Sequence, residues 1–258
     1  MRRITPELAV LGAVLVAVIG VTVFAFVSLP DRYDPFAPLD VRAEPAAVVT
    51  RLKLAQIRRD RTACDAALTS SGLKIQRVAH LSSQGCTLTE VVHVAPENRV
   101  FGQGFHATCP LAVGLALYMR HVVQPAARKH LGQEIVQVQH LGTFACRPVR
   151  NGKKLPEAGE PVQMSEHAAA NAIDITGFRA KDGRVIAIGK HWRKERPLQL
   201  ASAGPVPATE AADEAAAKFL REVRDGACAI FHAVLGPDYN ALHSTHFHFD
   251  MGRYRQCR

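Results

Sequence analysis

The chain lacks several patterns that assign other proteins to a class at once. Its six cysteines include no C-x-x-C pair, which argues against a zinc site built from thiolates. It has no recognition-helix pattern, no finger spacing and no strand pair combining aromatic and basic residues, so we expect no nucleic-acid partner. It has no internal repeat, and its serines have no credible histidine and aspartate partners, which argues against a serine hydrolase. The chemistry must therefore come from other residues.

The composition is that of a globular protein with a basic surface. With 48% apolar and 21% charged residues, the chain can bury a core, and its length suits one domain of about 200 residues plus an appendage. The formal net charge is +9, with basic clusters at Arg51, Lys53, Arg58, Arg59 and Arg61 and at Arg193, Lys194 and Arg196. Such a surface favours anionic partners, lipid head groups or an acidic polymer among them, or is simply solvated; the sequence leaves both readings open.

An uncharged stretch of 22 residues, Leu8 to Leu29, follows Arg2 and Arg3. A helix of this length crosses the roughly 30 Å hydrocarbon core of a membrane. The stretch is longer than the apolar region of a signal peptide, and no clean Ala-x-Ala cleavage site follows it. We expect an uncleaved transmembrane anchor over residues 1–29, with a cleaved signal as the alternative. The two arginines keep the N-terminus cytoplasmic, so the rest is exported in either case.

The remainder divides into a Pro-rich tether, residues 30–48, and a folded domain, residues 49–258. The cysteines are spread through the domain, as expected of disulfides in an oxidising compartment. Their pairing does not follow from the sequence. Only Cys64 with Cys86 is suggested, because both fall in one short N-terminal unit.

The order of expected elements is that of an α+β fold. Asp182-Gly183 is a strong hairpin turn signal, Pro110 suits the first turn of a helix and Gly132 suits its end. The apolar periodicity predicts helices through Cys64–Leu68, at Cys109–Gly132 and at Asp213–Gly236. The alternation predicts strands at Thr87–Val94, Glu134–Arg147, Ile173–Phe178, Val185–Gly189 and Thr245–Met251.

The stretch "HSTHFHFD" holds three histidines within eight residues. In a strand, His246 and His248 project from one face about 7 Å apart at the backbone. Phe247 and Phe249 then point to the opposite face, where a core requires them. His243, in the preceding turn, can lean over the same place.

A second cluster lies upstream in "SEHAAANAID", where His167 and Asp174 are seven residues apart. A histidine in a short helical turn and an aspartate on the following strand can converge on one point. Two neutral imidazoles and one carboxylate form a three-ligand catalytic zinc set, which leaves a position for water. Such a site lowers the pKa of water and polarises a carbonyl group. A further histidine near the metal can take up the proton of the water or stabilise the oxyanion.

"SEHAAANAID" resembles the S-x-H-x-x-G-x-A-x-D motif of the LAS metallopeptidases, and "HFH" resembles their H-x-H motif. This group includes D-Ala-D-Ala carboxypeptidases and dipeptidases, murein endopeptidases and hedgehog signalling domains. The peptidase resemblance covers chiefly Gln139 to Asp250. Together with "CP", "FACR", "DGR" and the terminal "CR", the pattern from about Leu52 to Arg258 resembles the bacterial extensin-like C-terminal domain family.

The resemblance implies a role for each matching residue. It makes His167, Asp174 and His248 the zinc ligands and His246 the histidine that acts on water or the oxyanion. "GTFACR" is similar to the S-G-Y-R segment of the peptidases, which places Arg147 at the scissile carbonyl or a substrate carboxylate; a surface ion pair is the alternative.

Two further positions have two readings each. Ser165 binds substrate or, the preferred reading, caps the turn of His167. Asp250 holds a ligand imidazole or pairs with an arginine. His243 is a candidate for substrate binding. Ala170 departs from the motif, which has glycine there, and its methyl group could narrow the pocket.

The expectation is an α+β, LAS/hedgehog-like fold with a small antiparallel sheet flanked by helices, after one N-terminal transmembrane helix. The implied function is a Zn²⁺-dependent peptidase, of DD or LD type, acting on peptidoglycan peptides. The implied place is the bacterial inner membrane, crossed once, with the domain in the periplasm. The alternative is a non-catalytic, zinc-containing wall-binding or signalling module.

Overall fold

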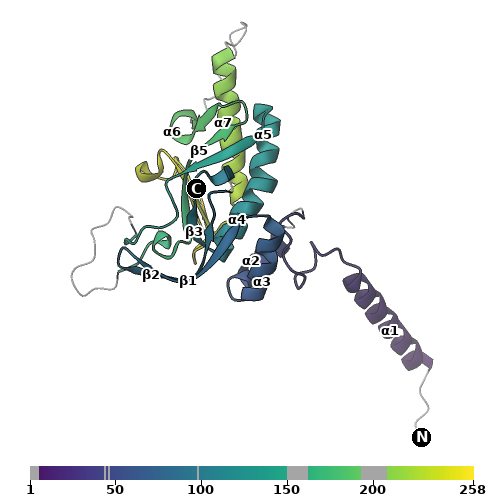
Figure 1. Ribbon diagram of the computed structural model, residues 1–258. Helices are drawn as coiled ribbons and strands as arrows, with labels where there is room; N and C mark the ends of the chain where they lie inside the picture. The colour runs from purple at the N-terminus through teal and green to yellow at the C-terminus, as the bar shows by residue number, and fades with distance from the viewer. Residues whose placement is uncertain (1–5, 44, 46, 98, 150–161, 193–207) are drawn as a thin grey trace.

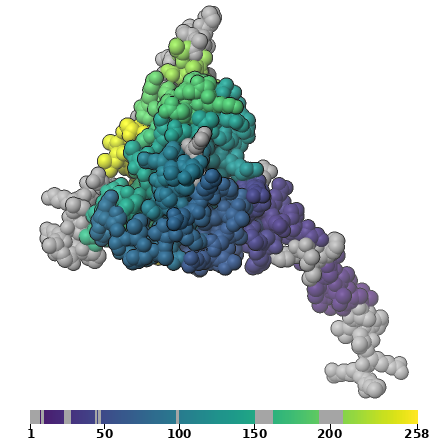
Figure 2. Space-filling model, viewed as in Figure 1, coloured from purple at the N-terminus to yellow at the C-terminus, as the bar shows by residue number. Residues whose placement is uncertain are grey.

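Two small sheets and the helices packed on them form an α+β fold in the computed structural model. The structure describes residues 6–43, 45, 47–97, 99–149, 162–192 and 208–258. Figure 1 shows the helix α1 (Pro6–Val27) apart from the rest, and Figure 2 shows the N-terminal segment, in purple, projecting from one corner of the body. Helix α1 therefore contributes little to the domain that carries the candidate site.

The predicted membrane anchor coincides with α1, which is a helix as expected. Among the described residues, however, no helix is both long and apolar enough to cross a membrane. The structure therefore does not support the predicted transmembrane helix.

Part of the predicted tether packs on the domain. Leu39 and Val41 are buried with the core, and the Val41 N–H donates to the hydroxyl of Ser70 at 2.9 Å. Lys53, from the first basic cluster, is buried and donates to the backbone carbonyl of Asp31. Residues 30–48 are thus not a free spacer over their whole length. The second basic cluster lies outside the described residues.

The first sheet is a three-stranded meander built on a tight hairpin. Its strands are β1 (Ile75–Ser83), β2 (Cys86–Val94) and β3 (Phe105–Thr108), in the order β1-β2-β3. Gln84 and Gly85 form the two-residue turn, both with positive φ, as such turns require. Two helices, α2 (Ala47–Ile57) and α3 (Arg61–Ser71), precede this sheet in the chain. The short helix η1 (Arg99–Phe101) lies in the connection between β2 and β3.

The predicted helix from Cys109 to Gly132 is confirmed, with a local change of geometry. It consists of α4 (Cys109–Tyr118), one π-helical turn η2 (Met119–Val123) and α5 (Gln124–Leu131). Pro125 lacks an N–H donor and its ring cannot tolerate regular α geometry, so the widened turn precedes it. Gly132 ends the helix in the left-handed conformation, with φ 63°.

The second sheet carries the candidate site. Its order is β4-β5-β8-β7-β9, with β6 paired to β5. The strands are β4 (Ile135–His140), β5 (Ala172–Ala180), β6 (Val185–Ala187), β7 (Ala233–Leu235), β8 (Phe247–Asp250) and β9 (Gln256–Cys257). The helical elements between them are η3 (Glu166–Ala169), α6 (Ile188–His191), α7 (Ala208–Ala227) and η4 (Ala241–His243). The predicted hairpin at Asp182-Gly183 is confirmed between β5 and β6.

Aromatic side chains of β8 face the core on the side away from His248 and from His246, which directly precedes the strand. Phe247 and Phe249 are fully buried, and Phe249 stacks on Phe231 with ring centroids 4.9 Å apart. Tyr118 of α4 meets Phe249 edge to face at 5.3 Å. In Figure 1, α5 and α7 lie side by side as part of this helical layer. The apolar face of β8 is thereby fixed, so the face with His246 and His248 points the other way.

Two predicted element boundaries are wrong. The helix expected at Asp213–Gly236 ends at Ala227, and the strand β7 follows it. At Gly226 an added Cβ would lie 2.4 Å from a methyl group of Val122, so α7 packs closely there before the chain turns back into the sheet. The strand expected at Glu134–Arg147 ends at His140, because Gly142, with φ 108°, turns the chain away.

Three disulfides join distant parts of the described chain. They are Cys64–Cys109, Cys86–Cys146 and Cys228–Cys257. The suggested pair Cys64 with Cys86 is wrong. Cys64 lies on α3 against the start of α4, whereas Cys86 lies at the tip of the β1–β2 hairpin, where the loop after β4 meets it.

Candidate metal centre

Three elements bring His167, Asp174 and His248 together. His167 lies in the short helix η3, whose first turn Ser165 caps by accepting a hydrogen bond from the His167 N–H at 3.3 Å. Asp174 on β5 and His248 on β8 are direct partners in the antiparallel register. Because side chains opposite each other in a sheet share a face, this register alone places the carboxylate beside the imidazole.

The donor atoms of these residues form a nearly equilateral triangle. His167 Nε2 lies 3.2 Å from Asp174 Oδ1 and 3.3 Å from His248 Nδ1. His248 Nδ1 lies 3.0 Å from Asp174 Oδ1. Two ligands of a tetrahedral zinc ion, each about 2.0–2.1 Å from the metal, are roughly 3.3 Å apart. The triangle therefore has the size that three zinc ligands require, and among the described residues these are the histidine, cysteine and acidic side chains that cluster in this way.

Hydrogen bonds on the far side of each ring fix which nitrogen points into the triangle. His167 Nδ1 faces the carbonyl oxygen of Thr143 at 3.2 Å, and His248 Nε2 faces Asp250 Oδ2 at 3.1 Å. Both partners are acceptors, so these nitrogens must carry the protons. In the neutral rings, His167 Nε2 and His248 Nδ1 then direct lone pairs at Asp174. Such outer partners are typical of metal-binding histidines.

The pKa shifts at the site indicate that a positive charge is stabilised beside Asp174. Burial raises the pKa of Asp174, but hydrogen bonds and the charges of His167 and His248 outweigh this and hold the pKa well below its usual range. Burial lowers the pKa of His248, but hydrogen bonds to Asp174 and Asp250 raise it to about 9. A bound proton thus stabilises the converging acceptors, and a metal ion would compete with it.

His246 and His243 flank the triangle. His246 Nε2 lies 3.7 Å from Asp174 Oδ1. The His243 ring lies 5.2 Å from that of His246 and 5.9 Å from that of His248. Its Nδ1 is 2.7 Å from Asn240 Oδ1, which caps the turn η4. Both rings are partly buried and lie beside the cluster.

Arg147 lies within electrostatic reach of both flanking histidines. Burial lowers the pKa of His243 to about 4, and the charges of His248, His246 and Arg147 contribute to the shift. Burial likewise lowers the pKa of His246, where Asp174 opposes the effect and Arg147 adds to it. The Arg147 side chain is partly buried and donates to the carbonyl of Pro148 at 3.4 Å. No ion pair links it to a carboxylate in the described part of the chain.

The contacts of Asp250 and Ser165 distinguish between the two readings that the sequence left for each residue. Asp250 is buried, binds His248 through Oδ2 and accepts the Gly252 N–H at 2.8 Å through Oδ1. It therefore holds the imidazole of a candidate ligand and forms no ion pair with an arginine of the described chain. Ser165 is also buried, and its hydroxyl accepts the His167 N–H, which is the capping role.

Ala170 does not narrow the site. Its backbone is left-handed, with φ 52°, a conformation that glycine adopts without strain. Its side chain is fully buried in a small cluster with Leu88 and Val91. The methyl group thus packs against the first sheet.

Sequence reasoning missed the residues that hold η3 in place. Asn171 accepts from the hydroxyl of Thr108 at 2.6 Å and donates to Glu166 at 2.6 Å. Its backbone carbonyl accepts from the N–H of Met251. Thr143 contributes only a carbonyl oxygen to His167, so its side-chain type gave no signal. Asn171 lay within the motif, but no spacing rule assigns an amide that joins three segments.

Comparison with known proteins places the domain in one family. No curated protein and no solved structure matches the chain. Residues 62–258, a span that includes all three disulfides and the triangle of His167, Asp174 and His248, match the model of the extensin-like protein C-terminus. The chain therefore belongs to the extensin-like protein C-terminus family.

Proposed function

We propose that this protein is a zinc-dependent peptidase that acts on peptidoglycan peptides. The observation that carries the proposal is the triangle of His167 Nε2, Asp174 Oδ1 and His248 Nδ1, with sides of 3.0–3.3 Å. Its three donors leave one tetrahedral position for solvent, as in catalytic zinc sites, whereas structural zinc sites use four protein ligands. The donor set of two imidazoles and one carboxylate fits zinc.

The residues around the triangle have complementary tasks in peptide hydrolysis. When bound, zinc would lower the pKa of water and polarise a carbonyl oxygen. His246 is partly buried and neutral, because its pKa is lowered mainly by burial; it can accept a proton from attacking water and return it to the leaving amine. The Arg147 guanidinium would orient the scissile carbonyl or a substrate carboxylate through its fork of donors.

The substrate class rests on the resemblance to LAS peptidases. Ser165, His167, Asp174, His246 and His248 are the residue types that the motifs carry at these positions. Enzymes of that group cleave wall peptides, which supports a DD- or LD-peptidase acting on a bond that involves a D-amino acid. His243, on the rim beside His246, is proposed to contact the substrate.

The proposed location is an oxidising compartment outside the cytoplasm. Three disulfides and no free cysteine in the chain support this, because such bonds rarely persist where thiols are kept reduced. Attachment to the bacterial inner membrane with a periplasmic domain stays a prediction from the sequence.

Metal content is the first test. The purified full chain should contain about one zinc per molecule, and His248→Ala should abolish tight binding, because the remaining two donors cannot hold the ion alone. The matched control is His80→Ala, which removes an exposed histidine of β1. Elemental analysis that finds equal zinc in all three proteins would contradict the ligand assignment.

Cleavage of defined muropeptides is the second test. Mass spectrometry should detect a shortened peptide with the wild type, none after chelation, and activity restored by zinc. His246→Ala should retain zinc yet lose roughly 10²–10⁴-fold in rate, as expected for loss of a general base. Zinc binding without cleavage of any peptide would favour the non-catalytic wall-binding or signalling module instead.

A further inference from the structure

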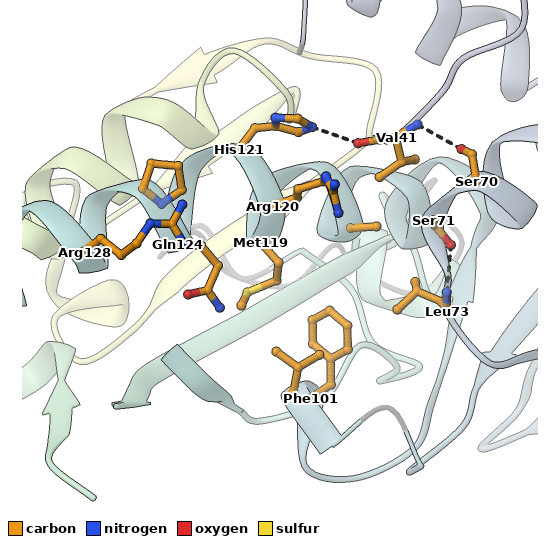
Figure 3. A pocket seen from close by; sticks show the side chains of 13 residues that line it. Val41, Ser70, Ser71, Leu73, Phe101, Met119, Arg120, His121, Gln124 and Arg128 are labelled. Carbon is orange, nitrogen blue, oxygen red and sulfur yellow. Dashed lines mark hydrogen bonds between the residues drawn. The ribbon is translucent and has the colours of Figure 1, made fainter. Parts of the chain in front are cut away.

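A second concave site lies on the helical side of the molecule. A cavity of about 630 Å³ opens beside the row formed by α4, η2 and α5, between the end of α3 and η1 (Figure 3). This volume is within the range of small-molecule sites. No residue of the metal centre contributes to its lining, so the proposed peptidase chemistry does not account for it.

The floor of the cavity is apolar. Its side chains come from the chain after α3, from η1 and from α4 with η2: Leu73, Val100, Phe101, Ala116 and Met119. Figure 3 shows Met119 and Phe101 on the same side of the helical row. A ligand that contacts this floor gains by removing apolar surface from water.

The neutral polar side chains of the lining are already engaged within the protein. The Ser70 hydroxyl donates to one backbone carbonyl and accepts a backbone N–H, and Ser71 does the same. The His121 ring is 2.8 Å from a carbonyl oxygen. Gln124 binds both the N–H and the C=O of one β4 residue, as a further strand would. These groups have little capacity left for a ligand.

Two arginines on the rim have that capacity. Arg120 is exposed, and in the described part of the chain its guanidinium forms no hydrogen bond or ion pair. Arg128 has only a loose, exposed pair with Glu134, at 3.8 Å. Of the described lining residues, none is acidic. Arg120 belongs to the π-helical turn, a feature found often at functional sites because it displaces side chains from regular helical positions.

We propose that this cavity binds a small amphiphilic anion, a carboxylate or phosphate head group on an unbranched apolar chain. The Arg120 guanidinium binds the head group through charge-assisted hydrogen bonds. The apolar floor, which includes Met119, receives the chain. A molecule of the same length with a cationic head group, or with no head group, cannot form the charge-assisted hydrogen bonds with Arg120. A short anion cannot contact the apolar floor.

Methionine methyl NMR tests the proposal at the site itself. The chain has four methionines, of which Met119 alone lines the cavity, so Met164 and Met251 are internal controls. In the ¹³C-methyl-labelled full chain, decanoate below its micelle concentration should shift the Met119 signal saturably. Acetate and decyltrimethylammonium should not. Decyl phosphate in a parallel titration distinguishes a phosphate head group from a carboxylate.

Arg120→Gln should weaken decanoate binding at Met119 by at least about tenfold, since a charge-assisted hydrogen bond is lost. Arg120 is exposed, so the variant should fold. Arg59→Gln, which alters an exposed arginine outside the lining, is the matched control and should bind as the wild type does.

The proposal is overturned if Arg120→Gln binds decanoate as tightly as the wild type, if the cationic decyl compound binds equally well, or if Met119 does not respond. The His248→Ala variant separates this site from the metal centre. It should bind decanoate normally even if it lacks zinc, and normal binding by a chain that proves to have no peptidase activity would leave this proposal standing.

Discussion

At the scale of single residues, hydrogen-bond partners decide what the candidate ligands can do. The carbonyl of Thr143 and the carboxylate of Asp250 each accept a hydrogen bond from one imidazole nitrogen, so the other nitrogen of that ring is free to bind a cation. The sequence indicated Asp250 as one of two readings. It gave no sign of Thr143, because a backbone carbonyl belongs to every residue.

Asp250→Asn tests this outer partner. The amide can still accept from His248, but without the charge it no longer strengthens the ligand, so the dissociation constant for zinc should rise roughly 10- to 100-fold. Competition with a chromophoric chelator measures it. Asp182→Asn, at an exposed hairpin turn, is the control, and an unchanged affinity in Asp250→Asn would show that the contact is only structural.

Tyr118 offers a prediction about stability. Its ring is fully buried against Phe249, but its hydroxyl has no hydrogen-bond partner among the described residues. Burial of an unpaired hydroxyl costs free energy, so Tyr118→Phe should leave the free energy of unfolding unchanged or raise it by up to about 1 kcal/mol. Urea unfolding measures the difference. A clear loss of stability would mean that the hydroxyl is satisfied after all.

At the scale of elements, local pattern and tertiary context contributed differently. The alternation in "THFHFDM" predicted β8 because its phenylalanines and histidines separate onto two faces, and the structure buries the phenylalanines. The prediction that the helix reaches Gly236 was wrong because "CAIFHAVL" is apolar enough for either a helix or a buried strand. The choice came from packing, where β7 pairs with both β8 and β9.

The disulfide Cys86–Cys146 ties the tip of the first sheet to the loop that carries Thr143 and Arg147. Replacing both cysteines with serine should lower the free energy of unfolding by about 2–4 kcal/mol and should also weaken zinc binding, because the carbonyl that orients His167 is less fixed. Thermal unfolding and chelator competition measure the two effects.

The double replacement of Cys228 and Cys257 is the matched control. This bond closes a shorter loop, with a sequence separation of 29 against 60, and it does not touch the Thr143 loop. It should cost stability but leave zinc affinity closer to that of the wild type. Equal losses of affinity in both variants would argue against a specific role for the Thr143 loop.

At the scale of the whole molecule, His140 couples folding to pH. His140 connects β4 to η1 by a contact of 2.9 Å with the carbonyl of Phe101, and burial lowers its pKa although this hydrogen bond opposes the effect. When the pKa of a histidine is lower in the folded state than in the unfolded state, protons bind more readily to the unfolded chain, and a fall in pH therefore favours unfolding. Its contribution to stability is present above about pH 6.5 and is lost as the pH falls below that value.

His140→Gln isolates this contribution from those of the other histidines. The variant should be less stable than the wild type at pH 7.5, because hydrogen bonds are lost, and the difference should narrow by pH 5, where the wild type alone pays for keeping residue 140 neutral. Urea unfolding of both proteins at each pH measures the difference. A gap that stays constant would show that His140 does not titrate differently on folding.

The resemblance of two short stretches to peptidase motifs singled out the three candidate ligands. Periodicity and turn signals by themselves determined the α+β class, the main helix with its glycine end and the β5–β6 hairpin. These features depend on neighbours within a few residues, so a linear pattern contains them. The disulfide partners, the end of α7, the packing of Leu39 and Val41 and the cavity beside Arg120 were decided only by tertiary structure. Each depends on which surfaces meet when segments many residues apart pack together, and many packings satisfy the same local preferences.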